Sequence, residues 1–181
     1  CALVWWARRC VKETVSSQDV ERGATVSVIM ENRIEFLDLL VGLNKIGVTA
    51  GLINTNLTGK PLMNCITVTQ SKKCIFGSEI TGALNEVKAD LELTEGEDYF
   101  EVPSVGQEPT TNWAKNLSAG AEEASEEDPE GTGQTTLGEV ALYIFTSGTT
   151  GLPKAAVLSN RRYLTSADMA AKAGFKCSEQ D

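Results

Sequence analysis

A loop rich in glycine and hydroxyl residues follows a short apolar run late in the chain. The run covers residues 141–145 and has the composition of a buried strand. The next nine residues include four hydroxyl side chains, two glycines and a lysine: Thr146, Ser147, Gly148, Thr149, Thr150, Gly151 and Lys154. Glycine lets backbone N–H groups approach an anion, hydroxyls donate hydrogen bonds to phosphate oxygens, and lysine adds a positive charge. The composition therefore predicts a cradle for a polyphosphate.

The spacing of this loop differs from that of a P-loop. In the Walker A motif four residues separate the two glycines and a lysine follows directly, whereas here Gly151 comes three residues after Gly148 and Lys154 follows Pro153. A P-loop kinase or GTPase is therefore disfavoured. Composition alone leaves a bland alternative, in which the segment is a flexible surface loop, the glycines serve turns and Lys154 is a solvated lysine.

The elements that must position the loop follow from the apolar pattern. Strands are predicted at residues 25–30, 48–53, 72–76 and 140–145. Helical spacing predicts helices at about residues 2–15, 32–46, 58–69, 80–87 and 159–173. Asn32 and Glu35 match a capping box, and Gly47 fits the end of that helix. Thr58 is a candidate N-cap, as is either Ser159 or Asn160. Alternating strands and helices predict an α/β fold, with a largely parallel sheet flanked by helices. A ligand loop after a strand is where such sheets bind ligands.

A segment at about residues 101–138 is expected to be an irregular acidic loop. It is rich in glycine, proline, serine and glutamate. Its acidic cluster consists of Glu122, Glu123, Glu126, Glu127, Asp128 and Glu130. Without these six carboxylates the net charge of −9 would be −3. The cluster therefore indicates a solvated loop, and the charge argues against a nucleic-acid partner.

Several classes of site are excluded or disfavoured by composition. The chain has no histidine, which excludes a Ser-His-Asp triad, a Cys-His pair or a His-ligated metal within it, and no metal-binding residue is predicted. Five scattered cysteines without a C-x-x-C pair favour reduced thiols in the cytosol. No apolar run is long enough to span a membrane. The chain begins at Cys1 rather than Met, so we expect an upstream segment to be missing.

The ordered string Thr-Ser-Gly-Thr-Thr-Gly-Leu-Pro-Lys at 146–154 resembles the AMP-binding signature of the adenylate-forming enzymes. Residues 30–36 and 42–57 resemble the fatty acid transport proteins, which are also known as very-long-chain acyl-CoA synthetases. Residues 74–79 and 152–156 fit the same family. The resemblance covers most of residues 23–90 and 139–176, and it implies that residues 1–181 are part of the large N-terminal domain of such an enzyme.

The resemblance also implies a reaction. A fatty carboxylate attacks the α-phosphate of ATP to give acyl-AMP and pyrophosphate, and the thiol of coenzyme A then displaces AMP. Residues 146–151 would wrap the β- and γ-phosphates, Thr149 and Lys154 would be catalytic, and Mg²⁺ would share the charge. The acyl, adenine and coenzyme A sites would lie downstream, so this polypeptide alone is expected to be inactive. Membrane association through segments outside the chain, at the endoplasmic reticulum or plasma membrane with a cytosolic catalytic domain, is expected on the same ground.

Three other functions remain open at this point. The protein could be a fatty acid transporter in which adenylation is vestigial. It could be another adenylate-forming enzyme, such as a bile-acid or carnitine ligase, a luciferase or a peptide-synthetase adenylation domain. It could also be a partial gene product without activity. Chain-length preference and oligomeric state are not determined by the sequence.

Overall fold

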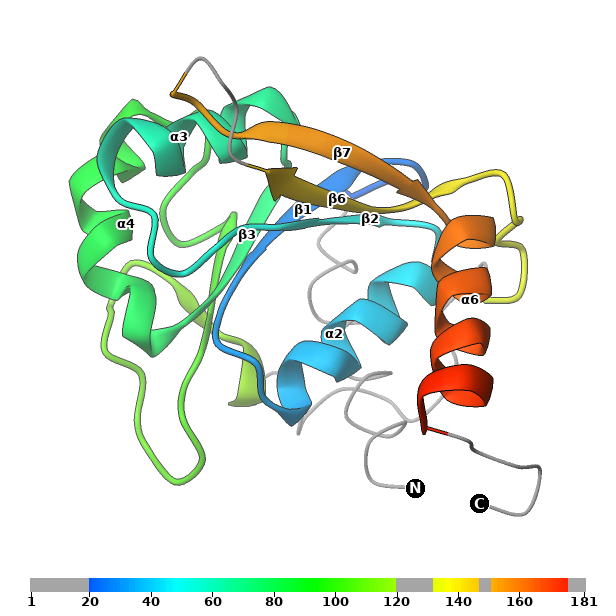
Figure 1. Ribbon diagram of the computed structural model, residues 1–181. Helices are drawn as coiled ribbons and strands as arrows, with labels where there is room; N and C mark the ends of the chain where they lie inside the picture. Colours follow the sequence, from blue (N-terminus) through cyan, green and yellow to red (C-terminus); the bar gives the residue numbers. More distant parts are fainter. Residues whose placement is uncertain (1–19, 120–131, 147–150, 176–181) are drawn as a thin grey trace.

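The computed structural model describes residues 20–119, 132–146 and 151–175. Within these residues one mixed sheet has the strand order β5-β4-β3-β1-β2-β6-β7 (Figure 1). The strands are β1 (Thr25–Ile29), β2 (Thr49–Leu52), β3 (Lys73–Gly77), β4 (Tyr99–Val102), β5 (Lys115–Asn116), β6 (Val140–Thr146) and β7 (Lys154–Ser159). All neighbouring pairs are parallel except β6 and β7. The predicted fold class, a largely parallel sheet flanked by helices, is confirmed.

Helices cover both faces of this sheet. They are α2 (Ile34–Lys45), α3 (Gly59–Val68), α4 (Thr81–Val87) and α6 (Asn160–Met169), with short turns η1 (Ser78–Ile80) and η2 (Lys88–Asp90) and a π-helical turn η3 (Ala170–Phe175). Figure 1 shows α2 on one side of the sheet and α3 and α4 on the other. Each side has its own apolar core, one built around α2 and one around α3 and α4.

Local patterns predicted most of these helices correctly. Leu39, Leu40 and Leu43 are buried on α2 as the periodicity indicated, and Gly47 ends the helix with a positive φ of 75°. Ser159 caps α6 by accepting a hydrogen bond from the backbone N–H of Arg162. Thr58 occupies the N-cap position of α3, although its side chain makes no capping bond. The predicted helix at 2–15 and the acidic cluster at 122–130 lie outside the described residues.

The predicted capping box of α2 is wrong. The N-cap is Arg33 rather than Asn32, and no side chain caps the helix. The Arg33 guanidinium donates a hydrogen bond of 2.7 Å to the carbonyl of Val102, and the Glu35 carboxylate lies 3.7 Å from Arg33 Nε. The start of α2 is therefore fixed by a contact across the sheet edge, which competes successfully with the local capping pattern.

The expectation of an irregular loop at about residues 101–138 also needs correction. Residues 101–138 are not uniformly irregular, because β4 extends to Val102 and β5 covers Lys115–Asn116. The carboxylate of Glu101 at the end of β4 is fully buried. It accepts hydrogen bonds of 2.5–3.0 Å from the Ser78 hydroxyl and from the backbone N–H and hydroxyl groups of Thr110 and Thr111. This carboxylate thus fixes the loop after β4 to the end of β3.

We predict that Glu101→Ala lowers the free energy of unfolding by about 2–3 kcal/mol, because two buried backbone N–H groups lose their acceptor. Burial raises the pKa of Glu101, but the hydrogen bonds from Ser78, Thr110 and Thr111 outweigh it and lower the pKa below its usual value. The ionised form therefore stabilises the fold above the unfolded-state pKa, and this contribution is lost as the pH falls through the folded-state pKa. Chemical denaturation at several pH values measures the difference. If the difference in free energy of unfolding between wild type and Glu101→Ala stayed constant in acid, the ionised carboxylate would not be the stabilising form.

Asp38 has the opposite pH dependence. Its side chain is only 6% exposed on α2, and burial, followed by the charge of Glu35, raises its pKa to about 6. A raised pKa contributes stability below the unfolded-state value, and this stability is lost as the pH rises through 6. We predict that Asp38→Asn raises the free energy of unfolding at pH 7 by about 1–3 kcal/mol and has much less effect at pH 4. Equal effects at both pH values in chemical denaturation would rule this out.

Candidate functional site

The candidate loop connects the two antiparallel strands of a hairpin. Thr146 is the last residue of β6 and Lys154 the first of β7, and the two pair in the sheet. The Thr146 hydroxyl also donates a hydrogen bond of 3.5 Å to the Lys154 carbonyl. Gly151 has a φ of +85°, which favours glycine there. Ser147, Gly148, Thr149 and Thr150 lie outside the described residues.

Lys154 was predicted within the loop, and the structure places it at the start of β7 instead. Its side chain is exposed. Within the described ranges, no carboxylate forms an ion pair with it. The ammonium group is therefore accessible to an anion from the solvent.

The loop lies at the carboxyl edge of the parallel strands. β6 runs parallel to β2, with Leu52 opposite Ile144, and β2 runs parallel to β1. Beyond the ends of these strands is a cavity of about 560 Å³. It is lined by Met30, Glu31, Asn32, Phe36, Leu52, Ile53, Asn54, Thr55, Ile144 and Phe145. A cavity at this edge has the position at which open α/β sheets bind ligands.

A larger cavity, of about 620 Å³, lies at the opposite edge. Its lining includes Lys72 and Asp98, near the amino end of β3. Asp98 forms an ion pair of 2.6 Å with the buried ammonium of Lys73. Ligands of parallel sheets bind at the carboxyl edge, and no phosphate-type loop borders this second cavity, so we do not assign it to the functional site.

Other reactive-looking residues are structural. Cys65 and Cys74 are buried, and burial raises their pKa values to about 11 and about 12, so both remain thiols. The backbone N–H of Glu31 donates to the Glu79 carboxylate at 2.8 Å. Both cysteines therefore act as small apolar residues, and the contact of Glu31 with Glu79 is made by its backbone rather than by its carboxylate.

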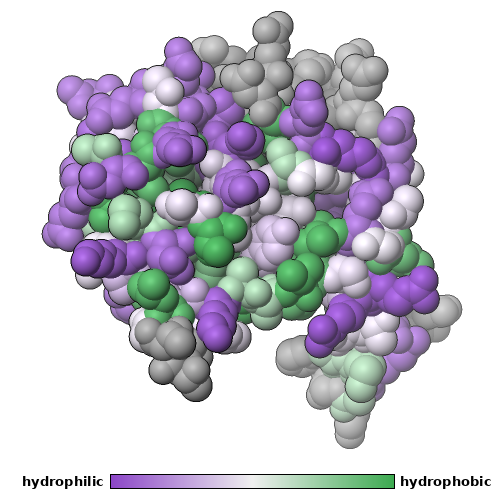
Figure 2. Space-filling view, turned by 90° about the horizontal axis from the view of Figure 1, so that it is seen from above, coloured by the Kyte–Doolittle hydropathy of each residue, from purple (hydrophilic) through white to green (hydrophobic). Residues whose placement is uncertain are grey.

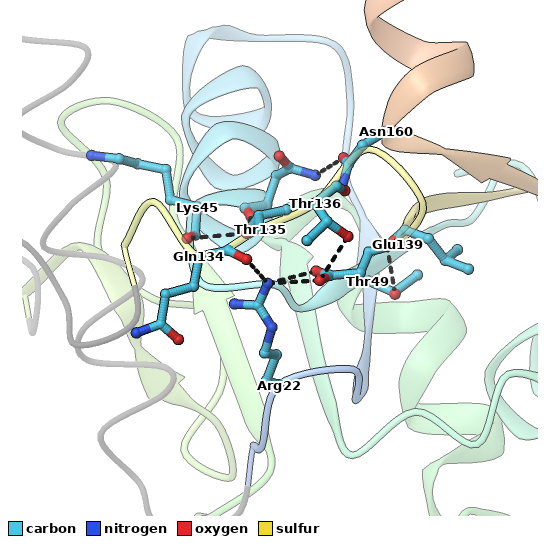
Figure 3. A network of polar contacts seen from close by, with 10 residues as sticks. Arg22, Lys45, Thr49, Gln134, Thr135, Thr136, Glu139 and Asn160 are labelled. Carbon is cyan, nitrogen blue, oxygen red and sulfur yellow. Dashed lines mark hydrogen bonds and ion pairs between the residues drawn. The ribbon is translucent and has the colours of Figure 1, made fainter.

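Polar contacts hold the end of the hairpin that is opposite to the candidate loop, before β6 and after β7. Figure 3 shows Arg22 between the carbonyl of Gln134 and the carboxylate of Glu139, with a shortest ion-pair distance of 2.7 Å. Asn160, at the start of α6, donates to the carbonyl of Thr136. The segment before β6 and the helix after β7 are thus joined, which fixes where the hairpin leaves the body of the domain.

A contact near the loop itself was missed by sequence analysis. The side-chain amide of Asn64, on α3, donates a hydrogen bond of 3.2 Å to the carbonyl of Pro153. The two residues are 89 positions apart, and no local pattern marks either for this contact. Arg22 and Glu139 were missed for the same reason, since they lie 117 positions apart.

Exposed apolar side chains also accompany the hairpin. Ile144, Leu152 and Val157 are 37%, 44% and 51% exposed. Figure 2 views the molecule from the side on which β7 lies and shows hydrophobic residues near the middle of that surface, with hydrophilic residues around them. Val157 pairs with Tyr143 and Ile144 pairs with Ala156, so Val157 and Ile144 face opposite sides of the hairpin and do not form one patch.

The described residues contain neither a membrane-spanning helix nor a cluster of metal-binding side chains. None of the helices is long and apolar enough to cross a lipid bilayer. Acidic, histidine or cysteine side chains do not gather there in groups of three or more that could hold a metal ion.

Known proteins share sequence and fold with this chain. The sequence profile described as AMP-binding enzyme matches residues 14–181. Long-chain fatty acid transport protein 1 of Bos taurus is 38% identical over 146 residues, and long-chain fatty acid transport protein 6 of Homo sapiens is 29% identical over 150 residues. The first alignment covers 78% of this chain and 22% of the relative, so the chain spans about a fifth of the length of the curated relatives it matches.

Solved structures show the same fold. An anthranilate–CoA ligase in complex with anthranoyl-AMP is similar with a TM-score of 0.80 at 18% identity, covering 94% of this chain and 31% of that one. A long-chain-fatty-acid–CoA ligase from Archaeoglobus fulgidus has a TM-score of 0.75 at 22% identity, covering 93% and 31%.

Proposed function

Since this chain belongs to the AMP-binding enzyme family, we propose that it forms part of the N-terminal adenylating domain of a long-chain or very-long-chain fatty acid–CoA ligase. The ligase first joins the fatty carboxylate to the α-phosphate of ATP and releases pyrophosphate. The thiol of coenzyme A then displaces AMP to give the thioester. Trapping the acid as a thioester would couple the reaction to fatty acid uptake.

One observation carries the proposal: the two ends of the string, Thr146 and Lys154, pair with each other in a hairpin at the carboxyl edge of the sheet. The residue types of the string fit a polyphosphate. Hydroxyl and ammonium groups donate hydrogen bonds to phosphate oxygens, and glycine lets backbone N–H groups come close to them. In the proposal, Thr146, Ser147, Gly148, Thr149, Thr150 and Gly151 bind the β- and γ-phosphates. Lys154 holds the departing pyrophosphate, which is charge stabilisation rather than covalent catalysis.

The substrate class rests on the relatives. Their names refer to long-chain fatty acid transport. The family profile that matches residues 14–181 covers both the sheet and the loop. Mg²⁺ enters the proposal as the companion of the nucleotide, and it would lessen the repulsion between the phosphates. Association with a membrane, through parts other than the described residues, belongs to the same proposal.

A second candidate is a transporter without adenylation, which the names of the relatives favour. Acid-dependent exchange of labelled pyrophosphate into ATP separates the two. The full-length protein is assayed with long-chain fatty acids, bile acids, carnitine, aromatic acids and amino acids. We expect exchange with long-chain fatty acids. Pyrophosphate exchange with another class of acid alone would indicate a different ligase. Exchange with none of the acids would favour the transporter.

A further inference from the structure

We propose that Asn64 is a positioning residue that holds Lys154 in place for binding the phosphates. The inference rests on the proposed function, because Lys154 matters only if the hairpin binds a polyphosphate. Its structural basis is the hydrogen bond of 3.2 Å from the Asn64 amide to the carbonyl of Pro153. Lys154 follows directly, so the bond fixes the peptide unit that carries its backbone nitrogen.

The position of this bond explains its importance. Pro153 has no backbone N–H, and it can therefore not donate to β6 across the hairpin. Regular pairing between the strands begins only at Lys154, opposite Thr146. The carbonyl of Pro153 thus accepts a hydrogen bond from a helix, one residue before the pairing of β7 with β6 begins.

Asn64 is itself firmly held. Its neighbours Leu62, Cys65 and Ile66 are buried on the inner face of α3 against the sheet. Asn64 lies beside that face and is half-buried, and the start of β7 passes α3 in Figure 1. A rigid helix therefore carries the donor, and a half-buried hydrogen bond is exchanged less readily with water than an exposed one.

Loss of this hydrogen bond should affect phosphate binding but not binding of the carboxylic acid. A hydrogen bond of this kind contributes a factor of about 3–10 to an equilibrium that depends on it. Losing it should weaken the contacts that Lys154 makes with phosphate, and should leave binding of the carboxylic acid unchanged. A residue that merely stabilised the fold would affect all substrates alike.

The test uses Asn64→Leu in the full-length protein, since leucine is close in shape and cannot donate. We expect the KM for ATP and for pyrophosphate to rise about 3–10-fold in the exchange assay, with the KM for the fatty acid unchanged. Asn64→Gln, which restores an amide, should recover part of the loss. Thr67→Ala, an exposed substitution one turn further along α3, is the matched control and should resemble the wild type.

Amide hydrogen exchange of the first residues of β7, without substrates, gives a readout independent of activity. It should be faster in Asn64→Leu and unchanged in Thr67→Ala. Unchanged exchange in Asn64→Leu, equal KM changes for all substrates, or no recovery in Asn64→Gln would overturn the proposal. Wild-type protein that lacks pyrophosphate exchange with every acid would instead contradict the proposed function, and hydrogen exchange would then decide alone whether Asn64 holds the hairpin.

Discussion

Replacing Lys154 by alanine is expected to lower the rate of fatty-acid-dependent pyrophosphate exchange by about 100- to 1000-fold. Loss of one preorganised donor to developing charge costs roughly 2.7–4 kcal/mol of transition-state stabilisation. The structure supports the choice of this residue, because its side chain is exposed at the first position of β7, beside the candidate loop. The measurement compares kcat and kcat/KM of variant and wild type in the full-length protein.

Lys172→Ala is the matched control for this prediction. Lys172 is also exposed, but its ammonium forms an ion pair of 2.8 Å with Asp168 at the end of α6, away from the hairpin. Removing it takes away the same charge from the protein and should change exchange less than twofold, because surface ion pairs contribute about 0–1 kcal/mol. Near-normal pyrophosphate exchange in Lys154→Ala would show that Lys154 is a solvated surface lysine without a role in the reaction.

The second large effect is expected for Thr149→Ala. The hydroxyl of Thr149 is proposed to donate to a phosphate oxygen, and its loss should reduce turnover by about 100- to 1000-fold. Thr149 lies outside the described residues, so this prediction depends on the sequence motif alone.

Thr149→Ser keeps the hydroxyl and serves as the control. It should retain most of the activity if hydrogen bonding is the role of the residue. Normal turnover in Thr149→Ala would remove Thr149 from the phosphate site. Equal losses in both variants would instead assign the role to the threonine methyl group.

The parts of the fold that depend on local pattern could be predicted from the sequence. The apolar stripe of α2 and the buried strands β1, β2 and β3 follow from periodicity, and Gly47 ends α2 as expected. The order of these elements then predicts a parallel sheet. The candidate loop could be placed because it follows β6 directly in the sequence.

Strand β4 was missed because Glu101 interrupts a short apolar run. A carboxylate in such a run suggests a loop, unless donors elsewhere neutralise the cost of burying it. Those donors, Ser78, Thr110 and Thr111, are distant in the sequence or lie in an irregular segment. Their convergence on one carboxylate is a property of the folded chain, and no local pattern reports it.

Strand β7 was missed for a different reason. It begins with Lys154, Ala155 and Ala156, and lysine and alanine have low strand propensity. Pairing with β6 determines its conformation. The same pairing changes the interpretation of Lys154 from a loop residue to the first residue of a strand. The hydrogen bond between Asn64 and Pro153 likewise becomes visible only once the hairpin has been placed against α3.

We propose that this hairpin serves the transfer of an adenylyl group to a fatty carboxylate. The most direct test incubates the full-length protein with ATP, Mg²⁺ and a long-chain fatty acid, with coenzyme A omitted, and identifies the products by mass spectrometry. We expect enzyme-bound acyl-AMP and free pyrophosphate, converted to acyl-CoA and AMP when coenzyme A is added, and no adenylate from the Lys154→Ala variant within the same time. Release of ADP and phosphate, or no acyl-AMP from a folded protein that still raises fatty acid uptake in cells, would contradict the account.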